Sequence, residues 1–320
     1  MSNVEFFPSL LSITGASEVL SVERIQSLWS GYGEISRVSL KDHVPVVVKH
    51  IQLPDQIAHP RGWATDLSHR RKVHSYEVER CFYAQYAAMC DAACRVPQYI
   101  GSEGEALLVL EDLNESGYPR RVESSSRLEV RACVNWLANF HARFLGVTPE
   151  GLWQKGTYWH LDTRPDELKA LSDMALKQAA PALDRSLTDG VPQTLVHGDA
   201  KIANFCFSED GEAVAAVDFQ YVGGGCGMKD LAYFMGSCLS ESECESQEAW
   251  ILDYYFCALR DALVKPGIDV DGLEASWRRV FPIAWADFHR FLKGWSPAHW
   301  KLNGYSEKKC RKALAMIGEP

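Results

Sequence analysis

Two short polar segments, each directly after an apolar run, constrain what this chain can fold into more than any other feature. The first, His-Gly-Asp-Ala-Lys-Ile-Ala-Asn, contains Asp199 and Asn204, five residues apart, and the second, Val-Asp-Phe-Gln, places Asp218 14 residues after Asn204. Apolar runs that end in such a turn are typical of buried strands. Two carboxylates and a carboxamide at this spacing predict a catalytic loop followed by a metal-binding loop, as phosphoryl transfer requires.

The composition limits the partners and the setting of the chain. With 320 residues, 47% of them hydrophobic, it can bury one large core or two smaller ones. A formal net charge of −9 argues against nucleic acid or an anionic membrane surface as a partner, since both attract clustered basic residues. The sequence shows no membrane span, no signal-peptide order and no Cys-x-x-Cys pair among its ten cysteines. We therefore expect a cytoplasmic protein with reduced thiols.

The N-terminal part has the pattern of an antiparallel sheet with a helix against it. Strands are predicted in three segments: residues 27–40, as two strands around a glycine turn, 45–51 and 106–113. Helices are predicted over residues 75–89 and, on the surface, over 18–26, whereas residues 52–72 have the character of a loop. A polar turn follows Asp112, and we place the boundary between two lobes, 1–112 and 113–320, at that point.

The C-terminal part is mainly helical in pattern. Apolar positions at helical spacing predict helices over residues 127–145, 165–180, 229–238, 248–264, 272–290 and 306–316. The two polar loops interrupt these helices as a short hairpin, and the glycine run at 223–227 is expected to be flexible. The chain as a whole is therefore predicted to be an α+β protein.

The remaining requirements of phosphoryl transfer from ATP also have candidates. Lys49 lies within an apolar strand, where a charge needs a partner, and Glu79 on the following helix is a better candidate than Glu77. The alternative is an edge strand with Lys49 directed to water. Gly31 and Gly33 would let a hairpin close over phosphates, although a plain turn explains them equally well. The histidines at 141 and 197, and the aspartate at 230, are expected to have structural roles.

The order of these segments resembles the aminoglycoside phosphotransferase and choline kinase group within the protein-kinase-like fold. The nearest likeness is to its ecdysteroid-kinase-like, or CHK-like, branch. The matching segments lie between about residues 25 and 235 and include the hairpin at 29–35, Val-Val-Val-Lys, Glu-Arg-Cys-Phe-Tyr at 79–83, Leu-Glu-Asp-Leu at 110–113, Leu-Ala-Asn-Phe-His at 137–141, and both polar loops. The resemblance implies a two-lobed fold, with an antiparallel-sheet N-lobe and a mainly helical C-lobe, that uses ATP and Mg²⁺.

The resemblance also implies a role for each candidate residue. Asp199 would be the catalytic base, Asn204 and Asp218 would bind Mg²⁺, and the nucleotide would meet Gly31, Tyr32, Gly33, Lys49, Glu79, and the backbone near Glu111 and Leu113. Gln220 stands where protein kinases have glycine, and His-Gly-Asp replaces their His-Arg-Asp. Both departures favour a small-molecule acceptor over a protein substrate controlled by activation-loop phosphorylation.

The sequence therefore predicts an ATP-dependent kinase that phosphorylates a hydroxyl group of a small organic molecule. A catalytically silent binding protein of the same fold is the alternative from another class, and a choline or aminoglycoside type of acceptor competes with a bulky alcohol. Acidic residues that could attract a cationic acceptor are Asp287, Glu241, Glu243 and Glu245. Tryptophans that could line the acceptor pocket, or belong to the core, are Trp136, Trp153, Trp159, Trp250, Trp277, Trp285, Trp295 and Trp300. The oligomeric state is not predicted.

Overall fold

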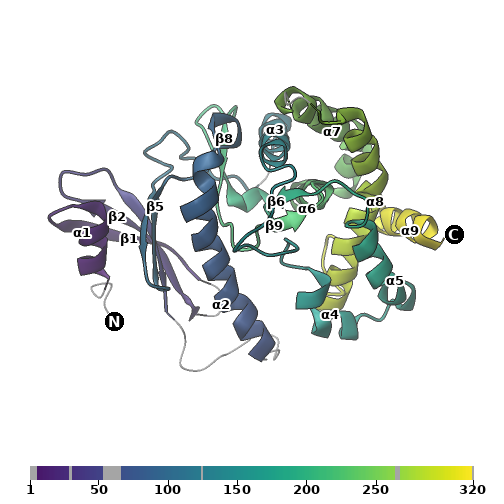
Figure 1. The fold of residues 1–320 in the computed structure, drawn as a ribbon, viewed down its shortest axis with the longest axis horizontal. Coiled ribbons are helices and arrows are strands. Elements are labelled where there is room, and N and C mark those ends of the chain that lie inside the picture. The colour runs from purple at the N-terminus through teal and green to yellow at the C-terminus, as the bar shows by residue number, and fades with distance from the viewer. Residues whose placement is uncertain (1–5, 29–30, 53–65, 124, 264–266, 319–320) are drawn as a thin grey trace.

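The structure, a computed structural model, describes residues 6–28, 31–52, 66–123, 125–263 and 267–318. Its N-terminal part is a five-stranded antiparallel sheet in the order β1-β2-β3-β5-β4. The strands are β1 (Val19–Ser27), β2 (Gly33–Leu40), β3 (Val46–Ile51), β4 (Tyr99–Glu103) and β5 (Leu107–Glu111). Helices α1 (Phe7–Thr14) and α2 (Asp66–Cys81) flank the sheet on opposite sides (Figure 1).

Strand alternation explains how the sheet serves both a core and a site. Val46 and Val48 on β3 pack with Leu10 of α1 in a small apolar cluster. Successive side chains of a strand point to opposite faces, so Lys49 faces α2 instead. The central strand thus packs apolar residues against α1 and places the Lys49 cation on the face towards α2.

The C-terminal part is mainly helical and surrounds one large core. Its helices are α3 (Arg127–Arg143), α4 (Pro165–Ala170), α5 (Met174–Ser186), α6 (Met228–Cys238), α7 (Glu241–Ala262), α8 (Val270–Trp295) and α9 (Gly304–Gly318). Two short antiparallel pairs carry the polar loops: β6 (Thr194–Val196) with β9 (Gly223–Gly225), and β7 (Phe205–Phe207) with β8 (Val214–Ala216). The predicted α+β fold, with a sheet-based N-lobe and a helical C-lobe, is confirmed. The exact boundary at residues 112 and 113 stays a prediction.

Several local predictions are wrong. Of residues 18–26, predicted to be a helix, residues 19–26 form most of edge strand β1, which pairs with β2. Of the predicted loop at 52–72, residues 53–65 lie outside the described residues, while 66–72 are the first turns of α2. The glycines at 223–225 form strand β9, paired with β6, instead of a flexible segment. Glycine is needed at 223 because an added Cβ would lie 2.1 Å from the Trp153 carbonyl oxygen. The predicted helix at 165–180 is two helices, α4 and α5.

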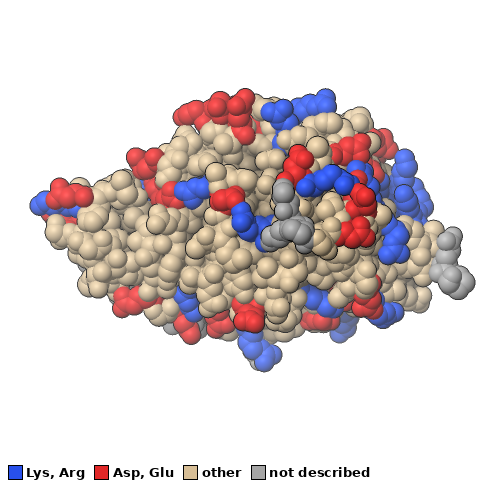
Figure 2. Space-filling model, turned by 45° about the horizontal axis from the view of Figure 1, so that its top comes forward, with Lys and Arg blue, Asp and Glu red and all other residues tan. Residues whose placement is uncertain are grey.

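On the face that Figure 2 shows, acidic and basic side chains are interspersed, and neither charge dominates. Within the described ranges, no helix has the length and apolar character needed to cross a membrane. The cytoplasmic location stays a prediction.

Candidate active site

A cavity of about 800 Å³ lies where the sheet meets the helical part. Most of the predicted site residues line it: Tyr32, Lys49, Glu79, Glu111, Leu113, Asp199, Asn204 and Asp218. The structure therefore brings together residues that are up to 186 positions apart in the sequence, from Tyr32 to Asp218. Gly31 and Gly33 are not among the lining residues.

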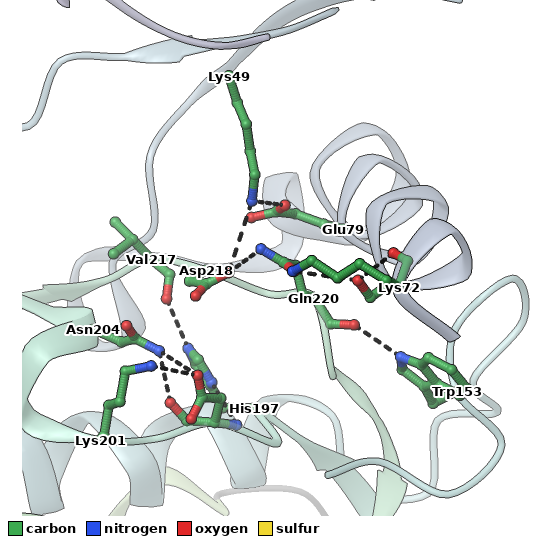
Figure 3. A network of polar contacts seen from close by, with 12 residues as sticks. Lys49, Lys72, Glu79, Trp153, His197, Lys201, Asn204, Val217, Asp218 and Gln220 are labelled. Atoms are coloured by element: carbon green, nitrogen blue, oxygen red, sulfur yellow. Dashed lines mark hydrogen bonds and ion pairs between the residues drawn. The ribbon is translucent and has the colours of Figure 1, made fainter. Parts of the chain in front are cut away.

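The strand lysine and the helix glutamate form a buried ion pair, as predicted. Lys49 Nζ contacts Glu79 Oε2 and lies 3.8 Å from Asp218 Oδ1 (Figure 3), and only 4% of Lys49 and 3% of Glu79 are exposed. Burial raises the pKa of Glu79, and the Lys49 ammonium acts in the opposite direction. The edge-strand alternative for Lys49 is wrong, because β3 lies between β2 and β5. Glu77 contacts His74 instead, at 2.8 Å.

The loop that carries Asp218 is held in an uncommon backbone conformation. Asp218 has a φ of 69°, which is uncommon for a residue with a side chain, and such strained residues cluster at functional sites. The next residue anchors the loop, because the Phe219 ring stacks on Phe82 with 3.9 Å between centroids. Gln220 Nε2 donates to Asp218 Oδ1 at 2.7 Å. Burial alone would raise the pKa of Asp218, but the nearby lysines, Lys49 above all, hold it below its usual value.

Three donors converge on the carboxylate of Asp199. Lys201 Nζ donates to Oδ2 at 2.8 Å, Tyr233 OH donates to Oδ1 at 3.0 Å, and Asn204 Nδ2 donates to Oδ2 at 3.1 Å (Figure 3 shows the lysine and asparagine contacts). Asn204 Nδ2 also donates to the Asp199 carbonyl oxygen at 2.8 Å. The amide nitrogen of Asn204 is therefore used within the loop, while its Oδ1 atom has no hydrogen bond among the described residues.

Buried polar residues beneath the loop hold its backbone. Asp230 accepts from the backbone N–H groups of His197, at 2.5 Å, and Gly198, at 2.9 Å, and lies 3.1 Å from His141 Nε2. His197 Nε2 donates to the Val217 carbonyl oxygen at 3.0 Å and so joins the two polar loops. The structural roles predicted for both histidines and for Asp230 agree with these contacts.

The hairpin glycines have a backbone reason of their own. Gly33 has a φ of 119°, and an added Cβ would lie 2.0 Å from the His50 carbonyl oxygen. Gly31 has a φ of 76° in the turn that precedes it. Tyr32 is buried, and its hydroxyl lies 2.7 Å from His69 Nδ1. Contact of these three residues with nucleotide phosphates stays a prediction.

At the end of β5, where the sheet meets the helical part, the groups available to a ligand are mainly those of the backbone. The Glu111 carboxylate contacts Arg95 and accepts from the Gln98 N–H at 2.7 Å. The Leu113 side chain is buried, and within the part of the chain that the structure describes its N–H has no hydrogen-bond partner. Contact of this backbone with adenine also stays a prediction.

Sequence reasoning missed the cations that α2 and the catalytic loop add to the cavity. Lys72 Nζ donates to Gln220 Oε1 at 2.8 Å and lies 4.7 Å from the Tyr76 ring centroid. Its position two helical turns before Glu79 is the signal that could have indicated it. Lys201, two residues after Asp199, was within the segment that predicted the catalytic loop.

Most of the tryptophans and acidic residues considered for the acceptor belong elsewhere. Among the tryptophans considered, Trp295 lines the described part of the cavity, whereas Trp136, Trp159 and Trp277 are fully buried in the core. Asp287 is paired with Arg290 at 2.7 Å and accepts from Trp159 Nε1 at 3.0 Å. The glutamates at 241, 243 and 245 lie in the first turns of α7, not in a loop beside the cavity.

Comparison with solved structures identifies the fold. A Thermobifida fusca protein provisionally identified as a fructosamine-3-kinase is 19% identical, with a TM-score of 0.56 over 97% of this chain and 99% of that one. Choline kinase LicA from Streptococcus pneumoniae is 14% identical, with a TM-score of 0.50 over 98% and 97%. The chain has the fold of the aminoglycoside phosphotransferase and choline kinase group. Amicoumacin kinase hAmiN, determined with AMP-PNP and Ca²⁺, shares it at 11% identity, with a TM-score of 0.53 over 99% and 93%.

Sequence comparison adds one partial match. A family model described as DUF1679, "Uncharacterized oxidoreductase dhs-27", matches residues 172–292, which include both polar loops, and this agrees with the CHK-like branch that the motifs indicate. The chain contains no Gly-x-Gly-x-x-Gly segment, the dinucleotide-binding signature of many oxidoreductases. No curated protein sequence matches the chain.

Proposed function

We propose that this protein is an ATP-dependent kinase that transfers the γ-phosphoryl group to a hydroxyl of a small organic acceptor. The observation that carries the proposal is the convergence of Asp199, Asn204 and Asp218 with the Lys49–Glu79 pair on one cavity. The kinase-like relatives with the same fold support it, and one of them was determined with an ATP analogue and a divalent cation. A silent binding protein is less well supported, because every group that the chemistry needs is present.

The proposed reaction uses Asp199 as the base. The acceptor oxygen forms a bond to the γ-phosphorus, the bond from that phosphorus to the bridging oxygen of ATP breaks, and ADP leaves with the electron pair. The acceptor proton passes to the Asp199 carboxylate. Lys201 and Tyr233 each donate to this carboxylate and so orient it, since their hydrogen bonds restrict its rotation.

The donor set fits Mg²⁺. Mg²⁺ prefers oxygen ligands and is held in kinases by one or two protein groups together with substrate phosphates. Asn204 offers Oδ1, because its nitrogen is used by Asp199, and Asp218 offers a carboxylate kept ionised by nearby lysines. Bound there, Mg²⁺ would neutralise charge on the phosphates. Lys49 would bind the α and β phosphates, with Glu79 holding its side chain in place.

The decisive experiment compares wild-type protein with Asp199→Asn in the release of ADP from MgATP across a panel of small alcohols. The substitution keeps the size of the side chain but removes the base, so turnover should fall by about 10²–10⁴-fold while MgATP affinity stays within a few-fold. Asp189→Asn, at an exposed position, is the matched control and should behave as wild type.

Two outcomes would contradict the proposal in different ways. Wild-type turnover by Asp199→Asn would remove Asp199 from its role as base. Failure of the wild-type protein to bind MgATP would instead favour the silent binding protein.

A further inference from the structure

Two arginines line the same cavity as Asp199. Arg71 comes from α2 and Arg164 precedes α4, and both line the cavity that also contains Asp199. Arg71 Nη1 donates to the Thr163 carbonyl oxygen at 2.7 Å, which places its guanidinium next to Arg164 in the fold. The two cations therefore come from segments far apart in the sequence and lie near each other in the cavity wall.

Among the described residues, one carboxylate, that of Glu167, lies within 4.0 Å of these two guanidinium groups. Arg164 pairs with Glu167 at 3.1 Å and donates through Nε to the Tyr158 carbonyl oxygen at 2.5 Å. Arg71 has no carboxylate within 4.0 Å among the described residues; its partners there are a carbonyl oxygen and the Ser68 hydroxyl. Burial first, and then the charge of Arg164, lower the pKa of Arg71 to about 10. A bound anion would relieve this repulsion.

The acidic groups of the cavity are already engaged. Three of the lining carboxylates form ion pairs: Glu79 with Lys49, Glu111 with Arg95, and Asp112 with Arg37 at 2.5 Å. The other two, Asp199 and Asp218, belong to the proposed catalytic and metal loops. The described lining contains no further carboxylate. A cationic acceptor would find no partner there and would meet the charge of two arginines.

An aromatic wall links the arginines to the proposed base. The Tyr158 ring lies 5.8 Å from Arg164 Cζ and 5.6 Å from the Tyr233 ring, and the Tyr233 hydroxyl donates to Asp199. Phe291 packs on Tyr158 with 5.5 Å between centroids, and Trp295 stacks on Phe291 at 5.9 Å. A ligand that joins both ends would lie along apolar ring surfaces.

We propose that the acceptor is an anionic alcohol, whose carboxylate or phosphate binds Arg71 and Arg164 while its hydroxyl lies at Asp199 and its apolar middle contacts Tyr158 and Phe291. Planar guanidinium groups suit such oxygen pairs because they donate two parallel hydrogen bonds. The inference rests on the proposed kinase function and narrows its substrate class.

Four benzyl alcohols with different second substituents test the inference by equilibrium binding to the full-length protein loaded with MgADP. The anionic probes are 4-(hydroxymethyl)benzoate and 4-(hydroxymethyl)phenyl phosphate; methyl 4-(hydroxymethyl)benzoate is neutral and 4-(aminomethyl)benzyl alcohol is cationic. At least one anionic probe should bind at least tenfold more tightly than the neutral and cationic probes, and the tighter anion tells carboxylate from phosphate.

Arg71→Gln should remove most of this preference while MgADP affinity changes by less than a few-fold. Arg71→Lys should keep part of the preference, because it retains the charge without the planar fork. Arg131→Gln, which removes one exposed positive charge from α3, is the matched control and should leave the preference intact. Unchanged thermal unfolding of each variant confirms that it is folded.

The inference is wrong if the neutral or cationic probe binds as tightly as both anions, if neither anion binds detectably, or if Arg71→Gln keeps the full preference. Phosphorylation of neutral or cationic alcohols that depends on Asp199, with no gain from a negative charge, would overturn the anion site but leave the kinase function standing. Absence of MgADP and MgATP binding would overturn the kinase function itself.

Discussion

Replacing Asp230 by asparagine should loosen the loop that carries Asp199 without changing a residue that lines the cavity. Asp230 is fully buried, and its two oxygens accept from the backbone N–H groups of His197 and Gly198. Burial alone would raise the pKa of Asp230, but the contacts with His141, His197 and the Gly198 N–H together lower it below its usual value, so the carboxylate is ionised at neutral pH. Asparagine has the same shape but only one acceptor oxygen, and its NH₂ group would face an N–H donor.

The expected loss follows from these contacts. One charge-assisted hydrogen bond disappears and one buried N–H loses its partner, which together cost about 2–4 kcal/mol of the free energy of unfolding. For a chain of this length that corresponds to a decrease of about 3–6 °C in Tm. Tyr255→Phe is the control, since it removes only the hydroxyl 2.7 Å from His141 Nδ1 and should cost about 1 kcal/mol.

Hydrogen–deuterium exchange locates the effect. In Asp230→Asn, a peptide covering residues 194–204 should exchange faster than in the wild-type protein, whereas a peptide from α9 should be unchanged. Denaturant unfolding provides the free energies of both variants. Wild-type stability together with wild-type exchange at residues 194–204 would refute the role of Asp230 as the support of the catalytic loop.

Two further substitutions test the backbone and the charge of the site. Gly198→Ala should destabilise the protein far more than Gly190→Ala. Both glycines have a positive φ (81° and 68°), but only at Gly198 would the new Cβ lie 2.0 Å from a carbonyl oxygen, that of Tyr221. At Gly190 we expect a loss of about 1–2 kcal/mol, and equal losses at both positions in thermal unfolding would contradict the close approach at Gly198. Burial, followed by the charge of Lys49, lowers the pKa of Lys72 to about 8 from 10.5, so the unfolded chain binds more protons between these pH values and wild-type stability rises with pH there. Without nucleotide, Lys72→Met should therefore be more stable than the wild-type protein by ~1–3 kcal/mol at pH 7. Denaturant unfolding should show this difference in stability decreasing towards pH 10.5. A difference that does not change with pH would contradict the lowered pKa of Lys72.

The sequence indicated the elements that bury an apolar pattern and missed those that other contacts define. The predicted strands at 45–51 and 106–113 and the helix at 127–145 agree with β3, β5 and α3, because each contributes regularly spaced residues to a core. Strand β1 is exposed along most of its length and is held by pairing with β2, so its own residues gave no strand signal. The first turns of α2 are polar and basic and offer no apolar period.

The proposed catalytic and metal residues could be predicted because they lie within short contiguous segments. The arginines that we propose for the acceptor could not, since Arg71 and Arg164 are 93 positions apart and only the fold brings them to one cavity. The acidic residues thought to attract a cation lie outside the cavity lining, and the anion site that we propose instead rests on these two arginines. A sequence shows which charges are present, but the fold decides which of them share a site.

Direct detection of the product tests the central claim. Wild-type protein is incubated with MgATP and the alcohol that gives the highest ADP release, and phosphorus NMR follows the reaction. We expect a new phosphomonoester signal that grows in step with ADP and is absent with Asp199→Asn. Accumulation of ADP and inorganic phosphate without any phosphomonoester, or the same phosphomonoester from the Asp199→Asn protein, would contradict it.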